Sequence, residues 1–249
     1  MKNIVGTGSA LERLKRIIPP SVQPKFGTVA EWRAWQESEG RKRCEELERE
    51  NQKIRAEKIF GRAGIQDLHR SCTFANYQVN GDGQRRALTL AKSYAQNFGD
   101  GFTSFVFSGK PGTGKNHLAA AIGNYLLQRG HTVLVVTIPD LMLRVRECYD
   151  TGKSEAELLD DLCRVDLLVL DEVGIQRDSR NEKVILNQVI DRRLSSMRPV
   201  GILTNLNHSD LCSTLGDRVM DRLQMDGGIW ANFDWDSHRK NVRHLRVVK

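Results

Sequence analysis

The chain of 249 residues lacks an apolar run long enough to cross a bilayer, and its N-terminus lacks the apolar segment of a secretion signal. Cysteines are few, odd in number and scattered without a C-x-x-C pair, which argues against a disulfide framework or a zinc site. They are Cys44, Cys72, Cys148, Cys163 and Cys212. Internal repeats and low-complexity tracts are also missing. We therefore expect a protein of a reducing, cytoplasmic compartment.

Hydrophobic residues make up 39% of the chain and charged residues 28%, which suits one or two domains with a packed core. The net charge of +7 is uneven: residues 1–70 carry 15 Lys or Arg against 10 Asp or Glu, and residues 239–249 carry five and none. Basic ends indicate contact with a polyanion or an acidic partner, although such residues also simply keep exposed helices soluble.

The first 60 residues are predicted to be helical and polar. Thr28 and Glu31 form a capping-box pattern, after which Trp32 and Trp35 fall on one helix face. Gly40 is expected to interrupt this helix. Four residues of the charged segment that follows have heptad-like spacing: Cys44, Leu47, Asn51 and Ile54. A segment this polar buries little apolar surface by itself. We therefore expect residues 1–60 to be an all-α partner-binding domain, with a plain helical hairpin as the alternative.

From Phe74 onward, apolar segments alternate with helix-like ones. Strands are expected at 102–108, 132–138, 165–170 and 200–204, and helices at 84–98, up to 129, 140–151 and 181–196. This alternation is typical of an α/β domain in which helices cover a parallel sheet. We assign residues 74–238 to this domain, residues 61–73 to a linker, and residues 239–249 to a basic C-terminal tail.

A G-x-x-x-x-G-K motif follows the first strand and opens a helix, which is the context that identifies a phosphate-binding P-loop. Its residues are Gly109, Lys110, Pro111, Gly112, Thr113, Gly114, Lys115, Asn116 and His117. Backbone N–H groups of such a turn and the helix N-terminus bind phosphate oxygens, and Lys115 can reach the β- and γ-phosphates. The sequence therefore predicts ATP binding.

Asn116 stands where the motif normally has Ser or Thr, whose hydroxyl binds Mg²⁺. An amide oxygen is still a possible ligand, but it lies farther out on a longer side chain. We expect magnesium binding with altered geometry and slower hydrolysis than in a threonine-bearing form.

Two acids follow a second apolar strand, 56 residues beyond Lys115. Asp171 is expected to hold the magnesium ion, and Glu172 to polarise the attacking water. The strand at 200–204 ends in Asn205, whose amide can hold that water in line or, alternatively, can simply form a turn.

Arg218 and Arg222 lie one helical turn apart. An arginine presented to a neighbouring subunit's γ-phosphate accelerates hydrolysis by ~10³–10⁵ where such fingers are known. The alternative is local pairing, of Arg218 with Asp221 and of Arg222 with Asp226.

Together these motifs resemble the AAA+ ATPases, and the segment 107–122 with its unusual asparagine is similar to the DnaC-type bacterial replicative helicase loaders. So are Asp171-Glu172, the segment 216–222 and the segment 233–237. The resemblance spans nearly the whole chain. It implies an AAA+ fold without a full lid domain, since 44 residues follow Asn205.

The resemblance also implies roles. Residues 1–60 would bind the hexameric replicative helicase, and the ATPase domain would bind ATP, Mg²⁺ and single-stranded DNA in a spiral oligomer. Asn205 would be the first sensor, Arg222 the arginine finger with Arg218 as alternative, and Arg239 the second sensor. Cys72 and Phe74 match the region near the adenine.

Three other functions are compatible with the same motifs. One is an IstB-type transposition helper that assembles on duplex DNA. Another is a nucleotide-gated DNA-binding adaptor with little turnover, and the third is a metabolic P-loop kinase, for which no small-substrate motif is evident.

Overall fold

The computed structural model describes residues 25–26, 28–60, 69–152, 154–174 and 180–238. Most of the expected linker, the C-terminal tail and Arg239 lie outside these residues. The chain divides into two units, residues 1–47 and residues 48–249, which are described separately. Among the described residues, no helix combines the length and the apolar character that a membrane crossing requires.

The N-terminal unit contains the start of a long helix, α2 (Val29–Phe60). Thr28 Oγ1 accepts a hydrogen bond from the backbone N–H of Glu31 at 3.2 Å, as the capping pattern predicts. The expected interruption at Gly40 is wrong, because a glycine costs a helix only about 1 kcal/mol and the flanking residues are strong helix formers. Trp32 and Trp35 stay 44% and 39% exposed.

The second unit contains a fully parallel five-stranded sheet in the order β2-β3-β4-β1-β5. The strands are β1 (Phe105–Gly109), β2 (Val133–Thr137), β3 (Leu167–Val173), β4 (Val200–Thr204) and β5 (Ile229–Phe233). Four of them match the expected strands to within a few residues. β5 was not anticipated, because its five residues are interrupted by a polar Asn232.

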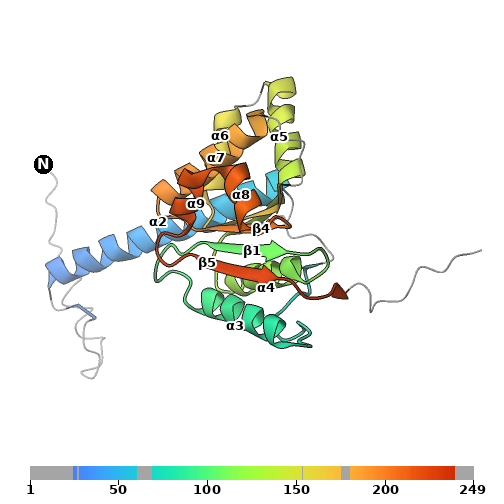
Figure 1. Cartoon of the computed structure of the whole chain (residues 1–249). Helices are drawn as coiled ribbons and strands as arrows, with labels where there is room; N and C mark the ends of the chain where they lie inside the picture. The colour runs from blue at the N-terminus through green and yellow to red at the C-terminus, as the bar shows by residue number, and fades with distance from the viewer. Residues whose placement is uncertain (1–24, 27, 61–68, 153, 175–179, 239–249) are drawn as a thin grey trace, which may run out of the picture. The chain divides into compact units, whose positions relative to one another are not determined.

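Helices cover both faces of this sheet, as Figure 1 shows. One face carries α3 (Asp82–Gln96) and α4 (Lys115–Leu127). The other carries α5 (Ile138–Thr151), α6 (Glu155–Arg164), α7 (Arg180–Ser195), α8 (His208–Leu215) and α9 (Asp217–Leu223). Alternate strand residues point to opposite faces: Val169 belongs to the α3–α4 core, and Leu168 and Leu170 to the other. The α/β expectation is thus confirmed.

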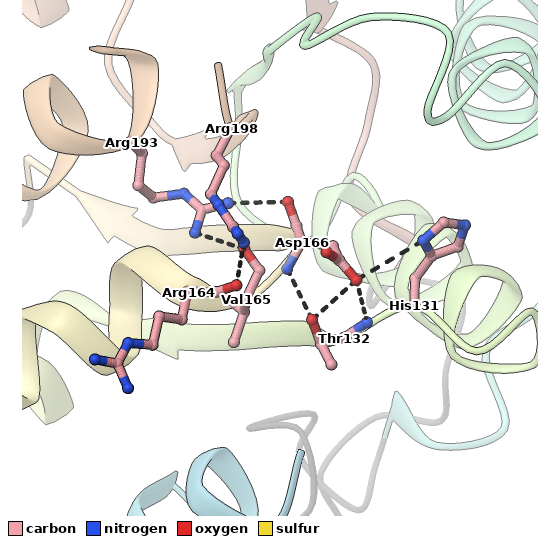
Figure 2. A network of polar contacts seen from close by, with 7 residues as sticks. All are labelled: His131, Thr132, Arg164, Val165, Asp166, Arg193 and Arg198. Carbon is pink, nitrogen blue, oxygen red and sulfur yellow. Dashed lines mark hydrogen bonds and ion pairs between the residues drawn. The ribbon is translucent and has the colours of Figure 1, made fainter. Parts of the chain in front are cut away.

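The amino edge of the sheet is held by a buried arginine (Figure 2). Arg193 is 0% exposed and donates to four backbone carbonyls. Its acceptors are the oxygens of Leu162 and Val165 at 2.8 Å, Asp166 at 3.0 Å and Pro199 at 2.8 Å. These residues lie at the end of α6 and just before β3 and β4.

Asp166 extends this network to β2. Its Oδ2 accepts from the backbone N–H of Thr132 at 2.8 Å and lies 3.8 Å from His131 Nδ1. Its own backbone N–H donates to Thr132 Oγ1 at 2.8 Å. The starts of three adjacent strands are therefore fixed by one polar cluster.

Candidate nucleotide-binding site

The glycine-rich turn joins β1 to α4 at the carboxyl edge of the sheet, where open α/β sheets bind ligands. Gly112 and Gly114 have φ of 76° and 97°, a region that side chains with a Cβ rarely adopt. A Cβ at Gly109 would overlap the backbone of Phe233, and one at Gly114 would lie 2.8 Å from the ring of Tyr77. The turn therefore needs its glycines both for conformation and for space.

Lys115 lies 6% exposed in the first turn of α4. Its Nζ donates to Gly109 O at 2.6 Å, Lys110 O at 2.8 Å and Asn205 Oδ1 at 2.8 Å. The predicted P-loop lysine and the predicted first sensor are thus in direct contact. Burial lowers the pKa of Lys115 to about 8, and the charge of Asp171 acts in the opposite direction.

Asn116 and Asp171 are also in contact: the amide Nδ2 donates to Asp171 Oδ2 at 2.5 Å. Burial raises the pKa of Asp171, whereas hydrogen bonds from the Glu172 backbone and from Asn116, and the charge of Lys115, lower it. Burial, followed by the charges of Asp171 and Asp140, raises the pKa of Glu172.

A β-bulge aims these two acids. The register of β3 against β4 shifts between Leu170 and Val173, and Glu172 has a φ of 61°. Bulges redirect side chains and concentrate at functional sites. The extra residue turns Glu172 away from the alternation of the strand, which sequence patterning alone could not reveal.

A cavity of about 390 Å³ adjoins the turn. It is lined by residues 112–117 of the motif, together with Cys72. Six further residues had not been singled out from the sequence: His69, Asn76, Tyr77, Gln78, Gln84 and His238. Phe74 is not among the lining residues and packs against Tyr125 instead, with 5.8 Å between ring centroids.

The outer side of the turn is covered by the segment that follows β5. Trp235 Nε1 donates to Thr113 O at 2.9 Å, and the backbone N–H of His238 donates to Gly112 O at 2.9 Å. Lys110 Nζ reaches Asp234 O at 2.9 Å. The segment after β5 therefore fixes the shape of the phosphate-binding turn. No local sequence pattern predicted this role.

Arg218 and Arg222 both lie on α9, but the local ion pairs given above as the alternative to an arginine finger are wrong. Both arginines pair with Asp191 of α7 instead, at 3.3 and 3.1 Å. Asp226 is engaged elsewhere, by the backbone N–H of Phe102 at 2.7 Å. The arginines are drawn to α7 because α9 packs against that helix.

The residues present fit a magnesium ion that is held jointly with a nucleotide. Within the described residues, no three His, Cys, Asp or Glu side chains gather as a metal site. Mg²⁺ in nucleotide sites is commonly bound by one or two protein ligands, with phosphates and waters supplying the rest. Asp171, and the side-chain oxygen of Asn116 beside it, offer such ligands at the carboxyl edge.

Comparison with protein families finds that residues 38–231 match the family of IstB-like ATP binding proteins. Among curated proteins, "Uncharacterized protein YdaV" of Escherichia coli (strain K12) is 59% identical over all of both chains. "Replicative helicase loader DnaC" of the same strain is 48% identical over 97% of this chain and 98% of its own length. A DnaC loader of Buchnera aphidicola subsp. Acyrthosiphon pisum is 46% identical over 93% of this chain and 95% of its own.

Solved structures agree in fold. The crystal structure of a DnaC helicase loader matches with a TM-score of 0.61 at 24% identity, covering 68% of this chain and all of its own. Replication initiator DnaA, bound to AMPPCP and single-stranded DNA, matches with a TM-score of 0.59 at 26% identity, covering 69% of this chain and 52% of its own.

Proposed function

We propose a function from one premise: this chain belongs to the IstB-like ATP-binding family and, within it, to the DnaC-type replicative helicase loaders. The function is to deliver a hexameric replicative DNA helicase onto single-stranded DNA. ATP binding is a property of that family. Delivery serves replication initiation or restart, and hydrolysis by this chain is part of the proposal.

The observation that carries the ATP-dependent part is the contact of Lys115 with Asn205 beside the Asn116–Asp171 pair. Four side chains from three segments, α4, β3 and the turn after β4, converge there on one edge of the sheet, next to a cavity of about 390 Å³. Nothing in the hydrophobic core requires this convergence, whereas a triphosphate does.

Each residue has a distinct task when a nucleotide is bound. Lys115 leaves its carbonyl acceptors for the β- and γ-phosphates, which attract its charge more strongly. Asp171 and the Asn116 oxygen would hold a magnesium ion, which supplies neutralisation of phosphate charge. Glu172, with its raised pKa, orients and polarises a water, and Asn205 keeps that water in line once Lys115 has moved.

Assembly completes the site in this proposal. Arg222, or Arg218 as the alternative, would reach the γ-phosphate held by a neighbouring copy, and Arg239 would act as second sensor. Residues 1–60 would bind the helicase, with exposed Trp32 and Trp35 as anchors. The ATP-bound spiral would bind single-stranded DNA through basic side chains, and loss of the γ-phosphate would relax it.

Co-purification with candidate hexameric helicases tests this function. We expect full-length protein to retain the helicase with ATP, and protein lacking residues 1–60 to lose it while still binding ATP. A Lys115→Ala variant should bind the helicase but not deliver it to single strands.

Two DNA-binding experiments test the alternatives. Filaments on duplex DNA without any helicase would favour the transposition helper. Equal affinity for single-stranded DNA with ATP, with ADP and without nucleotide would refute nucleotide gating.

A further inference from the structure

Asp191 of α7 lies between the two arginines of α9. Its Oδ1 is 3.1 Å from Arg222 Nη1, and its Oδ2 is 3.3 Å from Arg218 Nη2. The side chains of Asp191 and Arg222 are 27% and 26% exposed, whereas that of Arg218 is 73% exposed. One carboxylate therefore binds two cations, and the more buried of them is Arg222.

Arg222 is held by one nitrogen only. Nη1 donates to Asp191 Oδ1 at 3.1 Å, Ser195 Oγ at 3.1 Å and Asp191 O at 3.4 Å. Within the described part of the chain, its Nε and Nη2 make no hydrogen bond. Because a guanidinium has five N–H donors in a rigid plane, fixing one corner orients the others while leaving them available to an anion.

The two helices that carry Asp191 and Arg222, α7 and α9, are packed together in the core. Ile185, Val189 and Ile190 of α7 are buried in the same core cluster as Val219 and Met220 of α9. In the chain, α7 also connects β3, which carries Asp171, to β4, which precedes Asn205. A side chain placed by such a packed helix pair is held more precisely than one on a loop.

We propose that Asp191 is a positioning residue for Arg222: together with Ser195 it holds the guanidinium so that Nε and Nη2 face the γ-phosphate of ATP bound to a neighbouring copy. This inference rests on the proposed function, since it requires Arg222 to act across an interface between copies. Asp191 also neutralises part of the repulsion between Arg218 and Arg222. Without Asp191, the Arg222 side chain would sample several rotamers, and ordering it against the phosphate would cost conformational entropy.

Mixing two inactive variants tests this directly. Arg222→Ala keeps an intact ATP site without a finger, and Lys115→Ala keeps the finger without an ATP site. Full-length chains mixed in equal amounts, with single-stranded DNA and helicase, should recover about a quarter of the wild-type ATPase rate, because head-to-tail interfaces form at random. If this mixture recovers no activity, the proposed action of Arg222 between copies is wrong, and the inference about Asp191 falls with it.

The inference is tested by moving Asp191→Ala between the two partners. In the finger donor, Lys115→Ala/Asp191→Ala, it should cut the recovered rate at least about tenfold with the KM for ATP unchanged. In the receiver, Arg222→Ala/Asp191→Ala, it should leave the recovered rate unchanged, because the receiver's finger is already absent. An effect in neither position, or an equal loss in both, would overturn the positioning role.

A matched control uses another acid–arginine contact of α7. Asp160 of α6 lies 3.3 Å from Arg192, with both side chains about half exposed. Asp160→Asn in the donor should leave the recovered rate unchanged. A loss like that of Asp191→Ala would show that any weakened ion pair on α7 has this effect, and would overturn the specific role of Asp191.

Discussion

The two edges of one parallel sheet are built on opposite plans. At the amino edge, a fully buried Arg193 is saturated by backbone carbonyls, and Thr132 and Asp166 bond each other (Figure 2). At the carboxyl edge, Lys115 is likewise buried, but it lines a cavity, and one of its three acceptors is the side-chain oxygen of Asn205. Both edges bury a cation, but Lys115 lines a cavity of about 390 Å³, whereas Arg193 is 0% exposed and bonded to four carbonyls.

The difference teaches which buried charge stabilises and which one acts. Carbonyls that precede strands and end helices cannot leave their places, so Arg193 satisfies groups that would otherwise be orphaned. The pKa of Lys115 is lowered to about 8 because its partners compensate poorly for lost water. A bound triphosphate would supply the missing negative charge. Burial also lowers the pKa of Arg193 to about 10, so both edges bear the cost of a buried cation, and the carboxyl edge differs in having a cavity beside that cation.

The largest effect should come from breaking the amino edge. Arg193→Met removes the guanidinium donor from four backbone carbonyl oxygens, of which Val165 O keeps a bond from Arg198 Nη1 at 3.3 Å, and should lower the free energy of unfolding by about 4 kcal/mol. Urea denaturation measures this. Arg192→Met, which removes a half-exposed arginine one residue away, should cost no more than about 1 kcal/mol. Equal losses from both would contradict the role assigned to burial.

Removing Lys115, the cation of the carboxyl edge, should weaken ATP binding strongly but change the free energy of unfolding little. Lys115→Ala should weaken ATP binding about 100-fold in calorimetry, since a charge-assisted contact to phosphate is lost. Its free energy of unfolding should change by less than about 1 kcal/mol, because water from the cavity can bond the freed acceptors. Lys92→Ala, on the exposed surface of α3, is the control and should bind ATP normally. A Lys115→Ala variant as unstable as Arg193→Met would erase the distinction between the edges.

The pH dependence of ATP binding sharpens the comparison further. The folded-state pKa of Lys115 is about 8, below its ordinary 10.5, so nucleotide-free protein loses this proton as pH rises through 8. ATP favours the charged form, so affinity should fall by up to about tenfold per pH unit above 8. Without ATP the sign reverses: stability should rise between about pH 8 and 10.5, because there the unfolded chain binds the extra proton. Lys115→Ala should show neither slope between pH 7 and 9.

The smallest expected effect concerns Asn116. Replacing it by threonine removes the amide hydrogen bond to Asp171 and provides the shorter hydroxyl ligand. The ATPase rate should rise about threefold to tenfold, with half-maximal activity at lower magnesium, since both ligands would then meet the ion without rearrangement. Turnover measured across a magnesium titration checks this. An unchanged rate and an unchanged magnesium dependence would refute an inhibitory role for Asn116.

Local patterns predicted the α/β order, four of the five strands and the P-loop, because apolar periodicity and glycine spacing act over a few residues. They missed β5, which Asn232 interrupts, and the short helices α6 and α8, although the spacing of Leu158, Leu159 and Leu162 marks an apolar face on α6. For α2 the sequence predicted an interruption at Gly40 that the structure does not have, because one glycine costs little in a long run of helix formers. Roles for the site residues remain predictions, and Arg239 lies outside the described residues.

By itself, the sequence determined which chemistry the chain can offer: phosphate-binding glycines, a lysine, an acid pair and an arginine pair at fixed spacings. Tertiary structure alone decided which partners those groups have. It brought Asn205 to Lys115, Trp235 to Thr113, Asp191 to Arg222 and three distant carbonyls to Arg193. These pairs are separated by up to 122 positions, so only the packing of helices on a twisted sheet, and not any local preference, could bring them within bonding distance.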